Sequence, residues 1–120
     1  MQVSKRKVNK NLKNQFHQLL YQVIADIHNP KEAGSFLDGL LKKTELNMIT
    51  KRLAIAYYLD KGRRYEDIKT NLAVSSATIS TIAERMKKKR GFEIALKKIQ
   101  AEEWAERWAE KITRTFKRKK

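Results

Sequence analysis

Small side chains, most of them hydroxylated, recur between residues 75 and 81 of the chain. If this segment is helical, its spacing places several of them on one outward face. A helix with such a face can enter the major groove of DNA closely, where hydroxyls bond base edges or phosphates and a methyl group contacts thymine. We therefore expect the following residues to face bases: Ser75, Ser76, Ala77, Ser80 and Thr81.

Basic residues surround this face. The chain has 28 Lys and Arg against 13 Asp and Glu, a formal net charge of +15, which favours a polyanionic partner. The side chains expected to contact or approach DNA phosphates are Lys69, Thr78, Lys87, Lys88 and Lys89. The basic residues at the chain ends are expected to add phosphate contacts.

Two short helices must position these side chains. The first is expected at about residues 65–72 and the second after a turn at Ala73-Val74, with Ser75 as its N-cap. The inward apolar residues are Ile68, Leu72, Val74, Ile79 and Ile82. This pattern, over about residues 65–88, is typical of a DNA-binding helix-turn-helix. The alternative is an ordinary helical hairpin within a core.

The rest of the chain is also expected to be helical. Apolar residues from Val8 to Ile27 recur at spacings of three and four, which predicts a helix over about residues 8–28. Asn29, Pro30 and Glu32 then suit the start of a second helix.

A third helix is expected to run from a cap at Thr44 to Lys61 and to stop at Gly62. The helix that begins at Ser75 is expected to end at Gly91. Because the third helix is apolar on more than one side, we expect a partner chain to share it. The last helix, about residues 92–116, changes its apolar face near residues 100–103. The predicted fold is all-α, with about six helices.

Composition excludes several classes of protein. Without cysteine there is no disulfide framework, thiol nucleophile or cysteine-based zinc finger. We expect neither a membrane span nor a secretory signal, and a bacterial-type cytoplasmic, nucleoid-associated location. No catalytic residue, metal ligand or cofactor is predicted: His17 and His28 lack metal-pair spacing, and the glutamates near the C-terminus suit salt bridges, Glu103 with Arg107 and Glu110 with Arg114.

Three segments resemble the Trp repressor family. Residues 36–45 resemble the family's second helix and the start of its third. Residues 52–62 resemble the third helix, which ends in glycine. Residues 68–80 resemble the helix-turn-helix, with its Ala-Thr-Ile-Ser core. The likeness covers roughly residues 10–99, with a one-residue deletion near Arg63-Arg64. Lys69 stands where a small residue is usual, and Ala73 replaces the customary turn glycine.

The resemblance implies an intertwined homodimer that presents two helix-turn-helix units. It also implies a tryptophan site between two arginines, of which Arg52 matches one. The second arginine and the glycine after it fall on Thr81 and Ile82, and Lys42 replaces the family's threonine before the third helix. Tryptophan is therefore not expected as the effector, and whether another small molecule serves is left open.

These observations predict a homodimeric, sequence-specific regulator of transcription rather than an enzyme. We expect residues 1–99 to form the DNA-binding domain and residues 100–120 a C-terminal helical extension with a basic tail. One alternative is a low-specificity nucleic-acid binder, architectural or RNA-associated. The other is a protein-interaction module that uses the C-terminal helix through Trp108.

Overall fold

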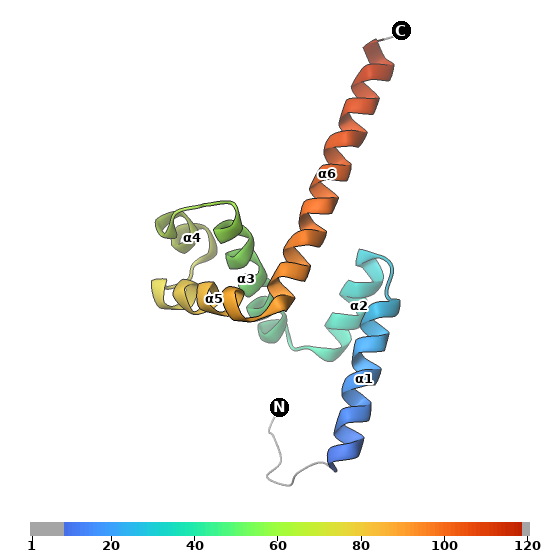
Figure 1. Cartoon of the computed structure of the whole chain (residues 1–120), viewed down its shortest axis with the longest axis vertical. Coiled ribbons are helices and arrows are strands. Elements are labelled where there is room, and N and C mark those ends of the chain that lie inside the picture. The colour runs from blue at the N-terminus through green and yellow to red at the C-terminus, as the bar shows by residue number, and fades with distance from the viewer. Residues whose placement is uncertain (1–8, 119–120) are drawn as a thin grey trace. The chain divides into compact units, whose positions relative to one another are not determined.

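The computed structural model describes the backbone of residues 9–118 and the side chains of residues 9–115. The described chain is helical, without strands, as the sequence predicts (Figure 1). It divides into two compact units, Met1–Leu46 and Asn47–Lys120. In order, the helices are α1 (Lys10–Asp26), α2 (Pro30–Leu40), α3 (Lys43–Asp60), α4 (Tyr65–Leu72), α5 (Ser76–Lys88) and α6 (Arg90–Arg118).

Asparagine side chains begin the two helices of the first unit. The Asn9 side chain caps α1 and accepts a hydrogen bond from Asn11 N at 3.0 Å. Val8, the predicted first residue of α1, lies outside the described residues. Asn29 Oδ1 accepts from Glu32 N at 2.8 Å with Pro30 at the first helical position, which confirms the predicted start of α2. No residue of α1 or α2 is buried.

The start of α3 differs from the prediction that Thr44 caps it. The helix begins at Lys43, so Thr44 lies inside its first turn. The Glu45 carboxylate instead accepts a hydrogen bond from Lys42 N at 2.8 Å, because a glutamate reaches back over the turn to satisfy a free N–H group. At the other end, Gly62 has φ +73° and Arg63 N donates to Tyr58 O at 3.0 Å, which ends the helix as predicted.

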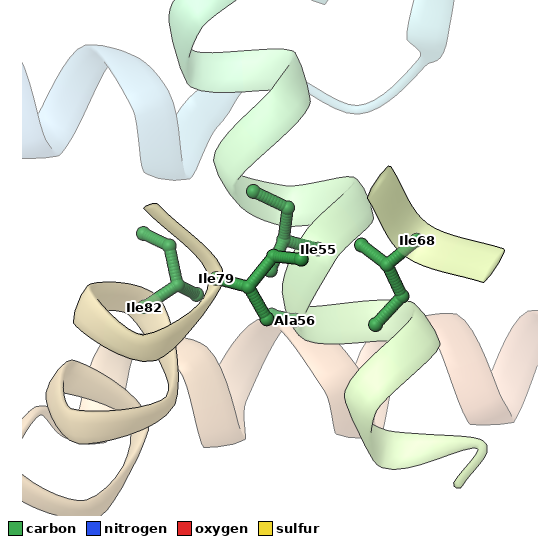
Figure 2. Close-up of a cluster of buried hydrophobic side chains, with 5 residues drawn as sticks. All are labelled: Ile55, Ala56, Ile68, Ile79 and Ile82. Carbon is green, nitrogen blue, oxygen red and sulfur yellow. The ribbon is translucent and has the colours of Figure 1, made fainter. Parts of the chain in front are cut away.

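The second unit contains a small core of isoleucines. Ile55 and Ala56 of α3, Ile68 of α4, and Ile79 and Ile82 of α5 are buried and converge in Figure 2. Six half-buried side chains pack around them: Tyr58, Leu59, Leu72, Val74, Met86 and Phe92. This core joins α4 and α5 to the C-terminal half of α3, and so fixes the orientation of α5.

The junction between α5 and α6 lies earlier than predicted. The sequence places the end of α5 at Gly91, but α5 ends at Lys88 and α6 begins at Arg90. Lys89 has extended backbone angles while its N–H group donates to Arg85 O at 2.7 Å, so a single residue suffices to separate the helices. Gly91 lies within the first turn of α6.

α6 is one continuous helix through the point where its apolar face changes side. There, Glu103 accepts hydrogen bonds from the Tyr57 hydroxyl at 2.6 Å and from Lys61 Nζ at 2.9 Å, and Gln100 donates to Asp60 at 3.1 Å. The predicted pair of Glu103 with Arg107 does not form, because Glu103 is turned toward α3. The predicted pair of Glu110 with Arg114 does form, at 3.4 Å.

Candidate nucleic-acid interface

The turn between α4 and α5 is tight because one residue takes a left-handed conformation. Ala73 has φ 53° and ψ 53°, a region in which glycine is usual. Ser75 then caps α5, and its Oγ accepts a hydrogen bond from Thr78 N at 3.2 Å, as predicted. α4 and α5 with this turn form the predicted helix-turn-helix.

The face of α5 opposite the core is lined by small side chains. All five predicted base-facing residues are exposed: Ser75, Ser76, Ala77, Ser80 and Thr81. Two hydroxyls are partly engaged within the helix, since Thr81 Oγ1 donates to Ala77 O at 2.9 Å and Ser75 Oγ lies 3.0 Å from Thr78 Oγ1. Thr81 can therefore still accept a hydrogen bond and offer its methyl group, whereas the hydroxyls of Ser76 and Ser80 can each donate and accept.

The predicted phosphate-contacting lysines lie at both ends of the motif, and Thr78 lies exposed in the first turn of α5. Lys69 of α4 is half-buried and lies 3.8 Å from Glu66, and Lys87 lies 3.5 Å from Glu84. Lys88 and Lys89 are exposed and make no ion pair with a described residue. Both ion pairs are long and at least partly open to solvent, so they are easily exchanged for phosphate contacts.

Two further residues of α5 lie at this interface without having been predicted from the sequence. Glu84 is exposed and follows Ser80 and Thr81 by one turn on the same face, so an acid lies among the expected base contacts. A carboxylate there can accept from a cytosine amino group and repels phosphates. Continuing the outward spacing beyond Thr81 would have identified it.

Arg85 is the second missed residue. It lines a pocket of about 270 Å³ together with Arg52, Thr78, Thr81 and Ile82. A second guanidinium therefore borders the pocket, one turn beyond the position that the family resemblance assigns to Thr81. The aligned position alone could not show this, because the arginine is displaced along the helix.

A larger and more apolar groove borders the same two arginines. Its volume is about 580 Å³, and its lining comprises Ile49, Arg52, Leu53, Arg85, Lys89, Arg90, Gly91, Phe92 and Ala95. Ile49 and Leu53 lie on the side of α3 that the isoleucine core does not cover, and both are exposed. The second unit therefore leaves an open apolar surface beside α5.

The titratable groups with shifted pKa values lie away from α5. The Tyr57 hydroxyl and then Lys61 donate to Glu103, which lowers the pKa of that carboxyl. The same hydrogen bonds raise the pKa of Tyr57 and of Lys61. These groups join α3 to α6. Among the described residues no group of three or more His, Cys, Asp or Glu side chains is arranged to hold a metal ion.

A comparison with protein families gives a match over most of the chain. The family model described as "Trp repressor protein" matches residues 14–100, which is most of the chain. The chain belongs to the Trp repressor family. The match covers α2 to α5 entirely, most of α1 and the first part of α6. No match was found among curated proteins.

Membership of the Trp repressor family indicates that the helix-turn-helix binds DNA. The Trp repressor family consists of helix-turn-helix DNA-binding regulators, not enzymes, and α4 and α5 lie within the matched residues. None of the described helices is both long enough and apolar enough to cross a membrane. The part of α6 after residue 100 lies beyond the family match.

Proposed function

We propose that this protein is a sequence-specific transcriptional regulator that binds duplex DNA as a homodimer, in the cytoplasm at the nucleoid. In this proposal α5 enters the major groove. Base contacts come from Ser75, Ser76, Ala77, Ser80 and Thr81, and phosphate contacts from Lys69, Thr78, Lys87, Lys88 and Lys89. The predicted division into residues 1–99 and an extension of residues 100–120 is part of the same proposal.

The observation that carries the proposal is the contrast between the two faces of α5. Its inner face holds two buried isoleucines, while its outer face is small, hydroxylated and exposed. Such a face contributes nothing to the core, and its side chains are short enough for the helix backbone to approach base edges. Ser76 and Ala77 also present free backbone N–H groups at the positive end of the helix dipole, which suits a phosphate.

The proposed dimer is supported by apolar surface that the single chain leaves open. Phe16, Leu19 and Ile24 of α1 are 64%, 57% and 52% exposed, and Ile49 of α3 is 46% exposed. A chain with 28 basic residues and so much exposed apolar surface is expected to cover that surface with a second copy. The groove beside Ile49 and Leu53 is one part of this surface.

The proposed regulator does not use tryptophan as its effector. Ile82 is 3% exposed and occupies the position where the family resemblance expects a glycine, so its branched side chain narrows the small pocket. Thr81 cannot supply a planar cation for an indole ring or a carboxylate. Arg52 and Arg85 leave the pocket suited to an anion of another shape.

Calorimetry with millimolar L-tryptophan tests this part of the proposal. We expect no saturable heat and no change in DNA affinity when tryptophan is added. A saturable signal accompanied by tighter DNA binding would contradict it and would indicate that Arg85 replaces the missing family arginine.

The proposal as a whole is tested by selecting sites from random duplexes at a stated salt concentration. A specific regulator is expected to prefer its selected site over bulk DNA by ~10³-fold or more. Thr81→Ala is expected to change the selected bases, with a loss of about 1–3 kcal/mol at a preferred position. Thr113→Ala is the matched control, because Thr113 makes the same hydroxyl-to-carbonyl bond, to Ala109 at 2.9 Å, on α6.

Three results would contradict the assignment of α5. If Thr81→Ala lowers the DNA affinity equally for all sequences, the outer face of α5 contacts phosphates and not bases. An unchanged profile would place recognition elsewhere. A wild-type protein without any preferred site would favour the low-specificity nucleic-acid binder, in which charge supplies the affinity.

A further inference from the structure

The C-terminal part of α6 carries an exposed aromatic stripe outside the family match. Trp104, Trp108 and Ile112 follow one another at intervals of four residues and are 58%, 47% and 50% exposed. The match ends at residue 100, whereas α6 continues to Arg118. This stripe therefore belongs to a feature that the family's helix-turn-helix does not account for.

The stripe begins directly after the point where α6 is fastened to α3. Glu103 accepts hydrogen bonds from Tyr57 and Lys61, and Gln100 donates one to Asp60. Side-chain hydrogen bonds therefore connect α6 to α3 as far along the helix as Glu103. Beyond it, the hydrogen bonds, ion pairs and ring contacts of residues 104–115 within the described chain remain inside α6. The stripe is thus presented on a fixed support and is not covered by its own unit.

Charged residues divide the remaining surface of this segment by sign. At about 100° per residue, Arg107, Lys111 and Arg114 form a row roughly a quarter turn from the tryptophans. Glu102, Glu106 and Glu110 form a second row on the opposite side of the helix. The aromatic stripe therefore has cations along one edge and the acids are directed away from it, while Arg114 also pairs with Glu110 at 3.4 Å across the two rows.

Aromatic and cationic groups meet in one shallow pocket. It has a volume of about 270 Å³ and is lined by Trp104, Arg107, Trp108 and Lys111. The two indole rings lie 5.6 Å apart between centroids and are tilted by 55°, and Lys111 Nζ lies 5.6 Å from the centroid of the Trp108 ring. A planar, apolar group with an anion attached fits this combination.

We propose that this pocket and the row beside it form a binding site for single-stranded nucleic acid, separate from the helix-turn-helix. An unpaired base stacks on an indole ring, and the phosphates bind Arg107, Lys111 and Arg114. From residue 104 to the C-terminus seven Lys and Arg stand against two Glu, which complements a polyanion. A duplex covers the faces of its bases, so the site discriminates in favour of single strands.

The placement of α6 supports a second site instead of an extension of the first. α6 starts at the C-terminal end of α5 and leads away from the N-terminal end of that helix (Figure 1). The exposed hydroxyl-bearing residues lie in the N-terminal half of α5. Both elements belong to the same compact unit. The two sites can therefore be tested separately.

Intrinsic fluorescence reports on the proposed site alone, because the chain has two tryptophans and both are in it. The full-length protein is titrated with a single-stranded oligothymidylate of about 16 nucleotides. We expect saturable quenching that is absent with poly-L-glutamate, which has charge but no bases. A labelled oligothymidylate gives the affinity by anisotropy, so variants that lack a tryptophan can also be measured.

Substitutions distinguish stacking from general charge. Trp104→Leu and Trp108→Leu keep apolar side chains and are each expected to weaken oligothymidylate binding about tenfold, as the loss of one stacked base would. Arg107→Gln is expected to weaken it as well. Lys98→Gln is the matched control, because it removes one exposed cation of α6 outside the pocket and is expected to change affinity less than about twofold.

Several results would overturn the proposal. They are the absence of quenching, equal quenching by poly-L-glutamate, and unchanged affinity of both tryptophan variants. A blue shift with phosphatidylglycerol vesicles but no response to the oligonucleotide would assign the stripe to a membrane surface. A shift in tryptophan emission that depends only on protein concentration would mean that the aromatic stripe binds a second copy of the chain. Duplex binding by the same variants is measured in parallel, so a failure here is distinguishable from a failure of the helix-turn-helix assignment.

Discussion

The two units of the chain cover their apolar side chains in different ways. In the second unit, isoleucines from α3, α4 and α5 bury one another almost completely. In the first unit, α1 and α2 have comparable apolar stripes, yet no residue of either helix is buried. Helix amphipathicity alone therefore does not indicate where a core forms. The helix-turn-helix is stabilised by a core within its own unit, whereas the apolar side chains of α1 stay exposed.

The largest expected effect comes from the isoleucine core. Ile79→Ala removes a fully buried side chain from α5, so the free energy of unfolding is expected to fall by about 2–5 kcal/mol. Urea denaturation followed by circular dichroism measures it. Ile94→Ala makes the same change at a half-exposed position of α6 and is expected to cost less than about 1 kcal/mol. Equal losses would show that the core does not stabilise the second unit as described.

The next effect concerns the exposed face of α1. Phe16→Ser is expected to raise the dissociation constant of the proposed dimer by about a hundredfold or more, because the change is present in both chains and burying each aromatic side chain contributes about 1.5–3 kcal/mol. Sedimentation equilibrium over a range of protein concentrations measures it. Asn14→Ser, on another side of the same helix, is the control. A folded wild-type monomer at micromolar concentration would remove the dimer and leave the face of α1 without a partner.

A smaller effect of opposite sign is expected at the turn of the motif. Ala73 has a left-handed conformation, so Ala73→Gly is expected to stabilise the protein by about 0.5–1 kcal/mol. Ala109→Gly, inside α6, is the matched control and is expected to destabilise by a similar amount. Thermal unfolding of the two variants gives the comparison. Destabilisation by Ala73→Gly would mean that this turn conformation is absent from the folded protein in solution.

The smallest effect is expected for the hydrogen bonds that connect Glu103 of α6 to Tyr57 and Lys61 of α3. Folding lowers the pKa of Glu103, so its stabilising contribution is present above the ordinary glutamate pKa and is lost as pH falls through the lowered value. The raised pKa values of Tyr57 and Lys61 have the opposite sense, and their contribution is lost as pH rises through those values. The difference in unfolding temperature between wild type and Glu103→Gln is therefore expected to be larger at neutral pH than in acid. A difference independent of pH would contradict the ion pair.

The helix-turn-helix was the most predictable part of the molecule. Its start at Tyr65, the cap at Ser75 and the inward isoleucines follow from short-range signals that the sequence carries directly. The start of α3 was less predictable because two neighbouring residues can supply a cap, and Glu45 rather than Thr44 does so. The partner of Glu103 could not be predicted, since it lies on another helix far away in sequence.

The candidate site shows the same limit. The exposed hydroxyl face of α5 followed from spacing, but Glu84 and Arg85 lie one turn beyond the segment that resembles the family's motif, and only the structure relates Arg85 to Arg52. Similarly, Trp104 and Trp108 are of a residue type that usually packs in a core. Their exposure depends on how far α6 projects beyond its last contact with α3, which sequence spacing does not reveal.

Four of the five buried side chains in the core that holds α5 in place are isoleucine, which is β-branched. In a helix, isoleucine is largely restricted to one χ1 rotamer, so Ile55, Ile68, Ile79 and Ile82 have few alternative packings. A core of leucine or methionine would allow α5 to shift by small rotamer changes. Here the orientation of α5 is largely set before DNA is encountered, so little conformational entropy of the helix is lost on binding. If α5 reads an operator as proposed, the protein is expected to tolerate few operators whose geometry requires α5 to tilt.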